Sequence, residues 1–171
     1  MMRSDAGLKG KIKALAKKSN LKPQELLQMY LFEHLLMRLE KSDYAETFVL
    51  KGGLLISSMT GVAQRTTMDM DTTVIGVDMD EGTVGKAVAV ICAVDAGDGM
   101  EYSFERIEPI REGDEYANWR AHLRVRYGKI DAPVKIDITT GDEIVPGRIE
   151  YRYPLMFEEG SVRVLSYPLE T

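Results

Sequence analysis

The chain has 171 residues, of which 44% are hydrophobic and 29% charged, and this composition is typical of a globular protein rather than a disordered or fibrous one. Its single cysteine, Cys92, and two histidines exclude a disulfide framework and a typical zinc site. The net charge of −5 argues against a protein whose main role is to coat nucleic acid. No signal-peptide pattern and no apolar stretch of about 20 residues is present, so we expect a cytoplasmic protein.

Helical periodicity dominates the first 42 residues and predicts two amphipathic helices. The first has apolar residues at helical spacing, at Leu8, Ile12 and Leu15. The second has a leucine at every fourth position, at Leu27, Leu31, Leu35 and Leu39. The helices separate where Asn20 can cap the first and Pro23 suits the first turn of the second. We therefore expect a helical arm over residues 1–42 and a core over residues 43–171, within one compact domain.

Six lysines gather in and just after the first helix, with no acidic residue between positions 6 and 24. They are Lys9, Lys11, Lys13, Lys17, Lys18 and Lys22. The simpler interpretation is a solvent-exposed basic face, and the more specific one is a surface that contacts RNA or phosphate. The sequence leaves both open.

A strand, a glycine turn and a short helix are predicted after Thr47. The segment FVLKGGLLISSMTG begins with a β-type run, continues through Gly52 and Gly53, and ends in an apolar stretch of about two helical turns. A loop that contains Arg65 and Thr67 then leads to the next strand. The turn and the loop therefore precede the first acidic strand.

Two aspartates share one face of that strand, which the alternation in MDMDTTVIGV places at residues 68–74. Met68, Met70, Thr72 and Val74 alternate with Asp69, Asp71 and Thr73. A helix that Asp78 or Asp80 caps is predicted to follow and to end near Val94. Further strands are predicted at residues 102–110, 118–127, 134–139, 149–153 and 162–165, in a mixed or antiparallel sheet.

A basic row is predicted on one face of the strand at residues 118–127. Arg120, His122, Arg124 and Arg126 alternate there with the apolar residues Ala121, Leu123, Val125 and Tyr127. Pairing this strand with residues 134–139 through their apolar faces would place Lys135 and Asp137 beside the arginines. The row could contact phosphate, or it could be a solvent face paired with Glu105 or Glu108.

The glycine turn, the Asp69–Asp71 pair and Asp137 together are suited to metal-dependent phosphate chemistry. Magnesium prefers oxygen ligands, and carboxylates on one strand face can hold two ions about 3.5 to 4 Å apart. Glycines allow backbone N–H groups to approach phosphate closely. The residues thus favour a site for a nucleoside triphosphate.

These residues resemble the DNA polymerase beta-like nucleotidyltransferases, and among them the AbiEii-type abortive-infection toxins. The resemblance comprises the FVLKGG segment, the spaced residues Arg65, Thr67, Asp69 and Asp71, and the Lys135–Asp137 strand. It implies an α/β (α+β) nucleotidyltransferase core, a small mixed twisted sheet flanked by helices, with an N-terminal helix pair. Family members continue into a helical C-terminal part, which the resemblance implies is missing here.

The resemblance also implies roles for individual residues. Asp69, Asp71 and Asp137 would be the catalytic carboxylates and the ligands of a two-Mg²⁺ site. The nucleotide-binding residues would be Lys51, Gly52, Gly53, Arg65, Thr67 and Lys135. Arg120, Arg124 and Arg126 are candidate contacts to phosphate or to the acceptor.

The implied activity is transfer of a nucleoside monophosphate from an NTP to an RNA, such as tRNA, or to a protein. The implied setting is a type IV toxin–antitoxin system in phage resistance, with a cognate antitoxin as partner. Two alternatives stay open: an incomplete remnant that acts as an interaction module, and a metal-dependent nuclease. The nuclease is disfavoured because Pro133 stands where its common motif has an acid.

Overall fold

The computed structural model describes residues 4–60, 66–75, 80–110, 118–142 and 145–168. Its elements are, in chain order, α1 (Asp5–Ser19), α2 (Pro23–Lys41), β1 (Phe48–Lys51), α3 (Gly52–Thr60), β2 (Met70–Ile75), α4 (Glu81–Cys92), β3 (Glu101–Pro109), β4 (Asn118–Tyr127), β5 (Ile130–Asp142), β6 (Ile149–Pro154) and β7 (Ser161–Ser166). Each helix and strand that the sequence predicted is present, and the largest difference is in β5, which extends over Ile130–Asp142 instead of residues 134–139. No helix among the described residues is long and apolar enough to span a membrane.

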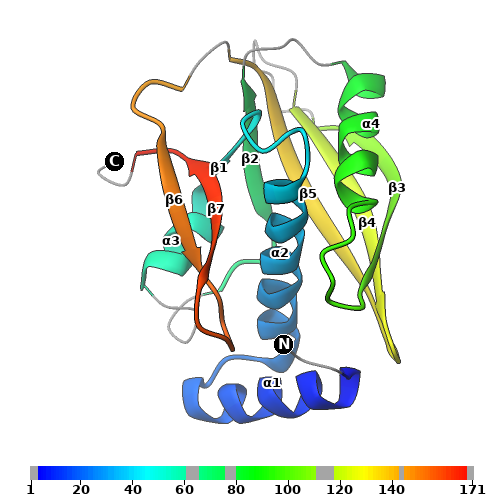
Figure 1. Cartoon of the computed structure of the whole chain (residues 1–171), viewed down its shortest axis with the longest axis vertical. Helices are drawn as coiled ribbons and strands as arrows, with labels where there is room; N and C mark the ends of the chain where they lie inside the picture. Colours follow the sequence, from blue (N-terminus) through cyan, green and yellow to red (C-terminus); the bar gives the residue numbers. More distant parts are fainter. Residues whose placement is uncertain (1–3, 61–65, 76–79, 111–117, 143–144, 169–171) are drawn as a thin grey trace.

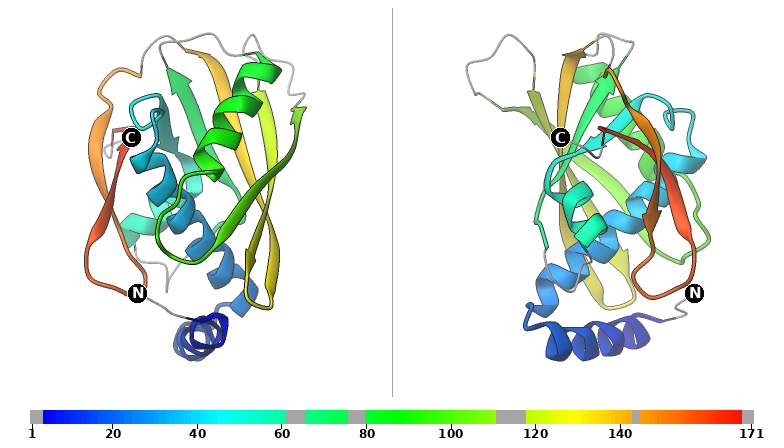
Figure 2. Two further views of the ribbon diagram at one scale, coloured as in Figure 1. Left: turned by 45° about the vertical axis from the view of Figure 1, so that its right-hand side comes forward. Right: turned by 90° about the vertical axis from the view of Figure 1, so that its left-hand side faces the viewer.

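The strands form one seven-stranded sheet in the order β3-β4-β5-β2-β1-β7-β6 (Figure 1). Strand β2 runs parallel to β5, and β1 runs parallel to β7, whereas the other neighbours are antiparallel. The predicted mixed sheet is therefore confirmed. Helices α2 and α4 lie along the sheet, and α1 crosses one end of it (Figures 1 and 2).

The two N-terminal helices end where the sequence predicts. Ser4 caps α1 by accepting a hydrogen bond from the Gly7 amide, and Asn20 closes α1 with a left-handed φ of 60°. Pro23 occupies the first turn of α2, where a missing N–H group costs no helical hydrogen bond.

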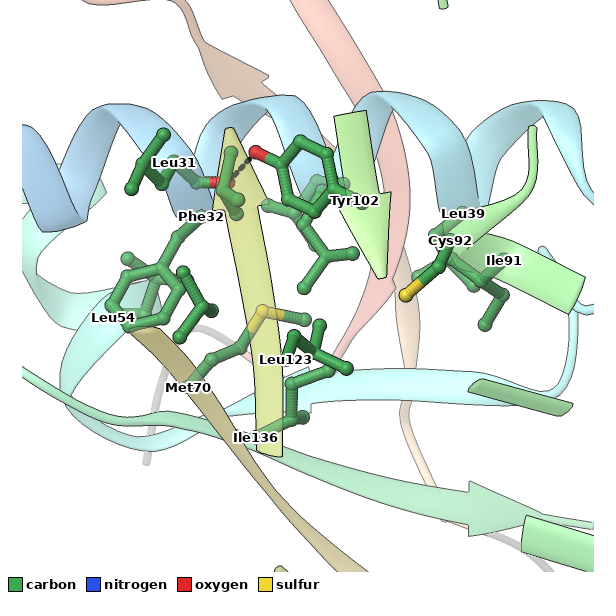
Figure 3. Close-up of a cluster of buried hydrophobic side chains, with 14 of the residues drawn as sticks. Leu31, Phe32, Leu39, Leu54, Met70, Ile91, Cys92, Tyr102, Leu123 and Ile136 are labelled. Carbon is green, nitrogen blue, oxygen red and sulfur yellow. Dashed lines mark hydrogen bonds between the residues drawn. The ribbon is translucent and has the colours of Figure 1, made fainter. Parts of the chain in front are cut away.

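Helix α2 is more deeply buried than an amphipathic helix would be. Every residue from 28 to 36 is buried, because the sheet covers one side and the β6–β7 connection covers another. In that connection the Met156 amide donates to the Glu33 carboxylate over 2.8 Å, and Phe157 packs beside Tyr30. Figure 3 shows α2 side chains packed on sheet residues such as Met70 and Ile136. The division expected at residue 42 stays a prediction, and α2 belongs to the main core.

A buried group of charges links α2 to the turn before β3. We call Arg38, His34 and Asp98 the α2 ion cluster. The Arg38 guanidinium donates to both Asp98 carboxylate oxygens over 2.8 Å, and the His34 imidazole lies 2.7 Å from the same carboxylate. Because all three side chains are at most 3% exposed, this cluster holds the start of β3 against α2.

Candidate active site

The turn between β1 and α3 lies directly against an aspartate of β2. Gly52 has a φ of +74°, and a Cβ built on it would lie 2.5 Å from the Asp71 Oδ2 atom. Only glycine satisfies both the backbone conformation and the close approach at this position. The turn and the carboxylate, 19 residues apart in the sequence, thus form one unit.

The second glycine packs on the loop that precedes β2. A Cβ on Gly53 would lie 3.1 Å from the hydroxyl of Thr67. That hydroxyl also exchanges hydrogen bonds with the backbone of Asp69, over 3.3 and 3.4 Å. Thr67 therefore fixes Asp69, which lies just before the first residue of β2, beside the glycine turn.

Four charged side chains cross the centre of the sheet in register. Lys51 on β1 lies opposite Asp71 on β2. Asp71 lies beside Asp137 on β5, and Asp137 lies opposite Arg120 on β4. Residues paired in this way point to the same face of a sheet. We call Lys51, Asp71, Asp137 and Arg120 the register row.

The register row points away from α2 and α4. The neighbours of its members along the strands, Met70, Ala121 and Ile136, are at most 5% exposed and belong to the main core. Met70 and Ile136 line one small cavity there together with side chains of α2 and α4. Because side chains alternate along a strand, the row occupies the opposite face.

An ion pair closes one end of the register row. The Arg120 guanidinium binds Asp137 through two hydrogen bonds, from Nε to Oδ1 over 2.8 Å and from an Nη atom to Oδ2 over 3.0 Å. At the other end the Lys51 ammonium reaches past β2 and donates to Thr139 of β5 over 3.1 Å. Cations therefore flank the two aspartates on both sides.

The aspartates of the site repel one another. Burial raises the pKa of Asp71 above its ordinary value, and the negative charges of Asp137 and Asp69 add to this effect. Lys51 and Arg120 oppose it. A nearby cation would stabilise the ionised form of a carboxylate in such surroundings.

The donor atoms fit a hard divalent cation, although they do not form a ready cage. Among the described residues, no group of three or more His, Cys, Asp or Glu side chains is arranged to hold a metal ion. Asp137 is turned toward Arg120, so its carboxylate would have to exchange the guanidinium for the cation. Because the side chains of Arg120 and Asp137 are 32% and 22% exposed, this exchange does not require unpacking the core.

The turn itself is suited to bind an anion. Gly52 and Gly53 open α3, and the first N–H groups of a helix have no partner within the helix. Their partial positive charge favours phosphate. The arrangement thus places an anion-binding helix start next to carboxylates suited to a cation.

The other predicted site residues lie farther from this centre. Lys135 is exposed on the same face as Asp137, opposite His122. Arg124 lies 3.1 Å from Asp131 and 3.6 Å from Glu105, and Arg126 lies 3.8 Å from both Asp131 and Glu101. The interpretation of the basic row as a face paired with Glu105 or Glu108 therefore fits Arg124 and His122, since His122 also contacts Glu108 over 2.8 Å. Arg65 lies outside the described residues.

Two contributors to the site were missed by sequence reasoning. Thr139 receives the Lys51 ammonium, and Glu25 at the start of α2 accepts a hydrogen bond from Thr66 over 2.9 Å. The alternation of Lys135, Asp137 and Thr139 along the strand indicates that Thr139 shares the face of Asp137, whereas nothing in the sequence signals the contact between Glu25 and Thr66. This contact ties the start of α2 to the loop before Asp69.

The chain is similar to one described protein family and to two solved structures. Residues 34–171 match the family described as nucleotidyl transferase AbiEii toxin of a type IV toxin–antitoxin system. The fold resembles that of a proposed nucleotidyltransferase from H. pylori, with a TM-score of 0.49, 18% identity and coverage of 84% of this chain and 54% of that one. It also resembles JHP933 from Helicobacter pylori, with a TM-score of 0.45, 17% identity and coverage of 84% and 53%. The chain therefore spans about half the length of these structures. No curated protein sequence matches it.

Proposed function

Because this chain belongs to the AbiEii family of nucleotidyl transferase toxins, we propose that the glycine turn and the register row form a site that transfers a nucleoside monophosphate from an NTP to an acceptor hydroxyl. The observation that carries the proposal is the contact of Gly52 with Asp71, which joins an anion-binding helix start to a carboxylate. The reaction releases pyrophosphate.

The substrate's triphosphate would lie at the start of α3. The amides of Gly52 and Gly53 would bind its terminal phosphates, and Lys51 would contribute a positive charge next to them. Arg120 would move from Asp137 to a phosphate oxygen, since a guanidinium binds either group in two-point fashion. Lys135 would contact a more distant phosphate. These contacts would fix the α-phosphate in line with the acceptor hydroxyl.

Asp69, Asp71 and Asp137 would hold divalent cations, which supply positive charge to the phosphates during transfer. Asp137, freed from Arg120, would accept the proton of the acceptor hydroxyl. The acceptor oxygen would form a bond to the α-phosphorus as the bond from this phosphorus to the bridging oxygen breaks. Pyrophosphate would leave with that oxygen.

The acceptor in this proposal is an RNA of the tRNA type, and the setting is a type IV toxin–antitoxin system in phage defence. The cognate antitoxin would counteract the activity in the cytoplasm, where both NTPs and tRNA are present. A protein acceptor is the second possibility.

The test is to incubate the protein with labelled NTPs and total tRNA, with Mg²⁺ or with EDTA. We expect Mg²⁺-dependent labelling that an Asp69→Asn, Asp71→Asn double variant lowers by at least 100-fold. Asp131→Asn is the matched control, because Asp131 is an exposed acid on the same strand as Asp137.

The binding of Mg²⁺-NTP, measured in parallel by calorimetry, separates the alternatives. A folded chain that binds no NTP and labels nothing would favour an interaction module. Shortening of the tRNA without labelling would favour a nuclease. Equal labelling by wild type and the double variant would contradict the proposed site.

A further inference from the structure

Helix α1 and the residues just after it form a basic segment on a chain whose net charge is −5. Six lysines lie on α1 or in the three residues after it, namely Lys9, Lys11, Lys13, Lys17, Lys18 and Lys22, and all are exposed. Within the described part of the chain, none of the six forms an ion pair, whereas Arg120, Arg124 and Arg126 all do. The charge of α1 is therefore available to an outside partner.

The helix is held rigidly although it lies at the end of the molecule. Leu8 and Ile12 are at most 4% exposed and pack into the main core. The Asp5 carboxylate accepts a 2.8 Å hydrogen bond from the Lys129 amide, in the turn between β4 and β5. Figure 1 shows α1 crossing below the start of α2 and the β4–β5 turn. Its lysines are thus presented from a fixed backbone.

One exposed face of α1 carries only small residues, and two of them, Ala6 and Gly10, line a groove between α1 and α2. Ala6, Gly10 and Ala14 recur at every fourth residue, so they lie above one another on one helix face, and all three are exposed. A Cβ on Gly10 would meet nothing within 4 Å, so packing within the chain does not require a glycine there. A glycine within a helix lowers its stability relative to alanine. A partner that approaches the helix backbone closely would explain why the position has no side chain.

The end of the basic segment, at Lys22, lies near the loop before the candidate active site. Lys22 and Glu25 form the start of α2, where the Lys22 amide donates to Glu25. Glu25 also accepts from Thr66, which is three residues before Asp69. A polymer held on α1 would therefore pass close to the loop that carries the first catalytic aspartate.

We propose that α1 is a docking helix for the phosphodiester backbone of the acceptor RNA, with lysines on both flanks of a smooth face. This inference rests on the proposed function for the identity of the polymer. An acidic protein segment is the competing partner, because an apolar groove of about 480 Å³ lies between α1 and α2. RNA is favoured because the lysines extend beyond this groove to Lys18 and Lys22, which do not line it.

The test measures tRNA binding by filter retention over a range of NaCl concentrations. The variant is Lys13→Gln, Lys17→Gln, and its matched control is Lys41→Gln, Lys86→Gln, which removes the same charge from exposed positions on α2 and α4. We expect the α1 variant to bind tRNA at least fivefold more weakly and to reduce the salt slope by about 1.5, since each phosphate contact contributes about 0.7 to 0.9. The control should resemble wild type.

A third variant, Gly10→Glu, tests the close approach. We expect it to weaken tRNA binding at least as much, with Mg²⁺-NTP binding unchanged. Equal tRNA affinity in the two double variants would overturn the inference. Poly-glutamate binding that depends on Lys13 and Lys17, without such a dependence for tRNA, would assign the helix to an acidic protein instead. The Asp69→Asn, Asp71→Asn variant should keep tRNA binding, so a failure of the proposed chemistry is separable from a failure of this inference.

Discussion

Two Arg–Asp pairs in this protein have the same bond geometry and opposite surroundings. Arg38 binds Asp98 through two hydrogen bonds of 2.8 Å, and Arg120 binds Asp137 through bonds of 2.8 and 3.0 Å. The side chains of the first pair are 2% exposed, whereas those of the second are 32% and 22% exposed. The two pairs therefore differ in the burial of their side chains and not in the geometry of their hydrogen bonds.

The buried pair has little capacity left for another ligand. Asp98 accepts hydrogen bonds from Arg38 and from the Met100 amide, and it lies within bonding distance of His34. Burial alone would raise the pKa of Asp98, but the hydrogen bonds from Arg38 and His34 outweigh it and hold this pKa below its usual range. The α2 ion cluster thus stabilises the packing of β3 on α2.

The open pair keeps its capacity for exchange. Among the described residues, Arg120 is the only side chain that donates a hydrogen bond to the Asp137 carboxylate, and Asp71 next to it is a second carboxylate. In the proposed function, the pair would open to admit a phosphate to Arg120 and a cation to the aspartates. Two ion pairs with the same bond geometry thus differ in whether their members can exchange partners without unfolding the core.

The largest expected effect is a loss of stability when the arginine of the buried pair is replaced. The same replacement in the open pair should have a much smaller effect. Arg38→Met should lower the free energy of unfolding by about 3 to 5 kcal/mol, because Asp98 is left buried and unpaired. Arg120→Met should cost less than about 1 kcal/mol, because water reaches the freed Asp137. Urea unfolding of both variants measures the difference. Equal losses would show that the two pairs do not differ in the way described.

A second prediction concerns the pH dependence of the buried region. Burial raises the pKa of Glu33, next to His34, to about 8. The folded state therefore holds a proton that the unfolded state loses above its ordinary pKa of 4.5, so this residue makes stability fall as the pH rises from about 4.5 to 8. Glu33→Gln should be more stable than wild type at pH 8.5, by roughly 1 to 3 kcal/mol, and nearly equal to it at pH 4.5.

Glutamine keeps an oxygen that can accept the hydrogen bond from Met156. The difference between the two proteins therefore isolates the charge of Glu33. Thermal unfolding at both pH values is the measurement. A gain in stability that is the same at pH 4.5 and pH 8.5 would rule out titration as its cause.

Replacing a glycine of the turn before α3 should have a smaller effect on stability. It should have a large effect on nucleotide binding. Gly52→Ala should cost about 1 to 2 kcal/mol for the positive φ and should also displace the Asp71 carboxylate. Gly97→Ala is the matched control, because Gly97 has a φ of +73° and a Cβ there would meet nothing within 4 Å. Both variants should lose similar stability, and only Gly52→Ala should lose Mg²⁺-NTP binding. Retained binding in that variant would argue against the turn as part of the site.

The sequence predicted most of the fold because its periodicities are strong. The alternation along β4 and β5 predicted that Asp137 would lie on the same face as the arginines, and the register of Asp137 with Arg120 confirms it. The glycine turn and the following strand were likewise visible as local patterns. These features depend on neighbours in the chain or on one strand pair.

The α2 ion cluster could not be predicted in this way. Arg38 and Asp98 are 60 residues apart, and their pairing depends on how the turn before β3 packs on α2. The same holds for Gly52 and Asp71, whose contact follows from the antiparallel pairing of β1 with β2. The exchangeable character of the Arg120–Asp137 pair depends on side-chain exposure, which appears only after folding.

The most direct test of the central claim is a titration of ¹⁵N-labelled protein with NTP and substoichiometric Mn²⁺, followed by NMR line broadening. We predict the strongest broadening at the amides of Gly52, Gly53 and Asp71, and much less at Asp98 and Met100. An Asp71→Asn variant should lose this pattern. Broadening that is strongest near the α2 ion cluster, or that is unchanged in Asp71→Asn, would contradict the assignment of the register row as the nucleotide site.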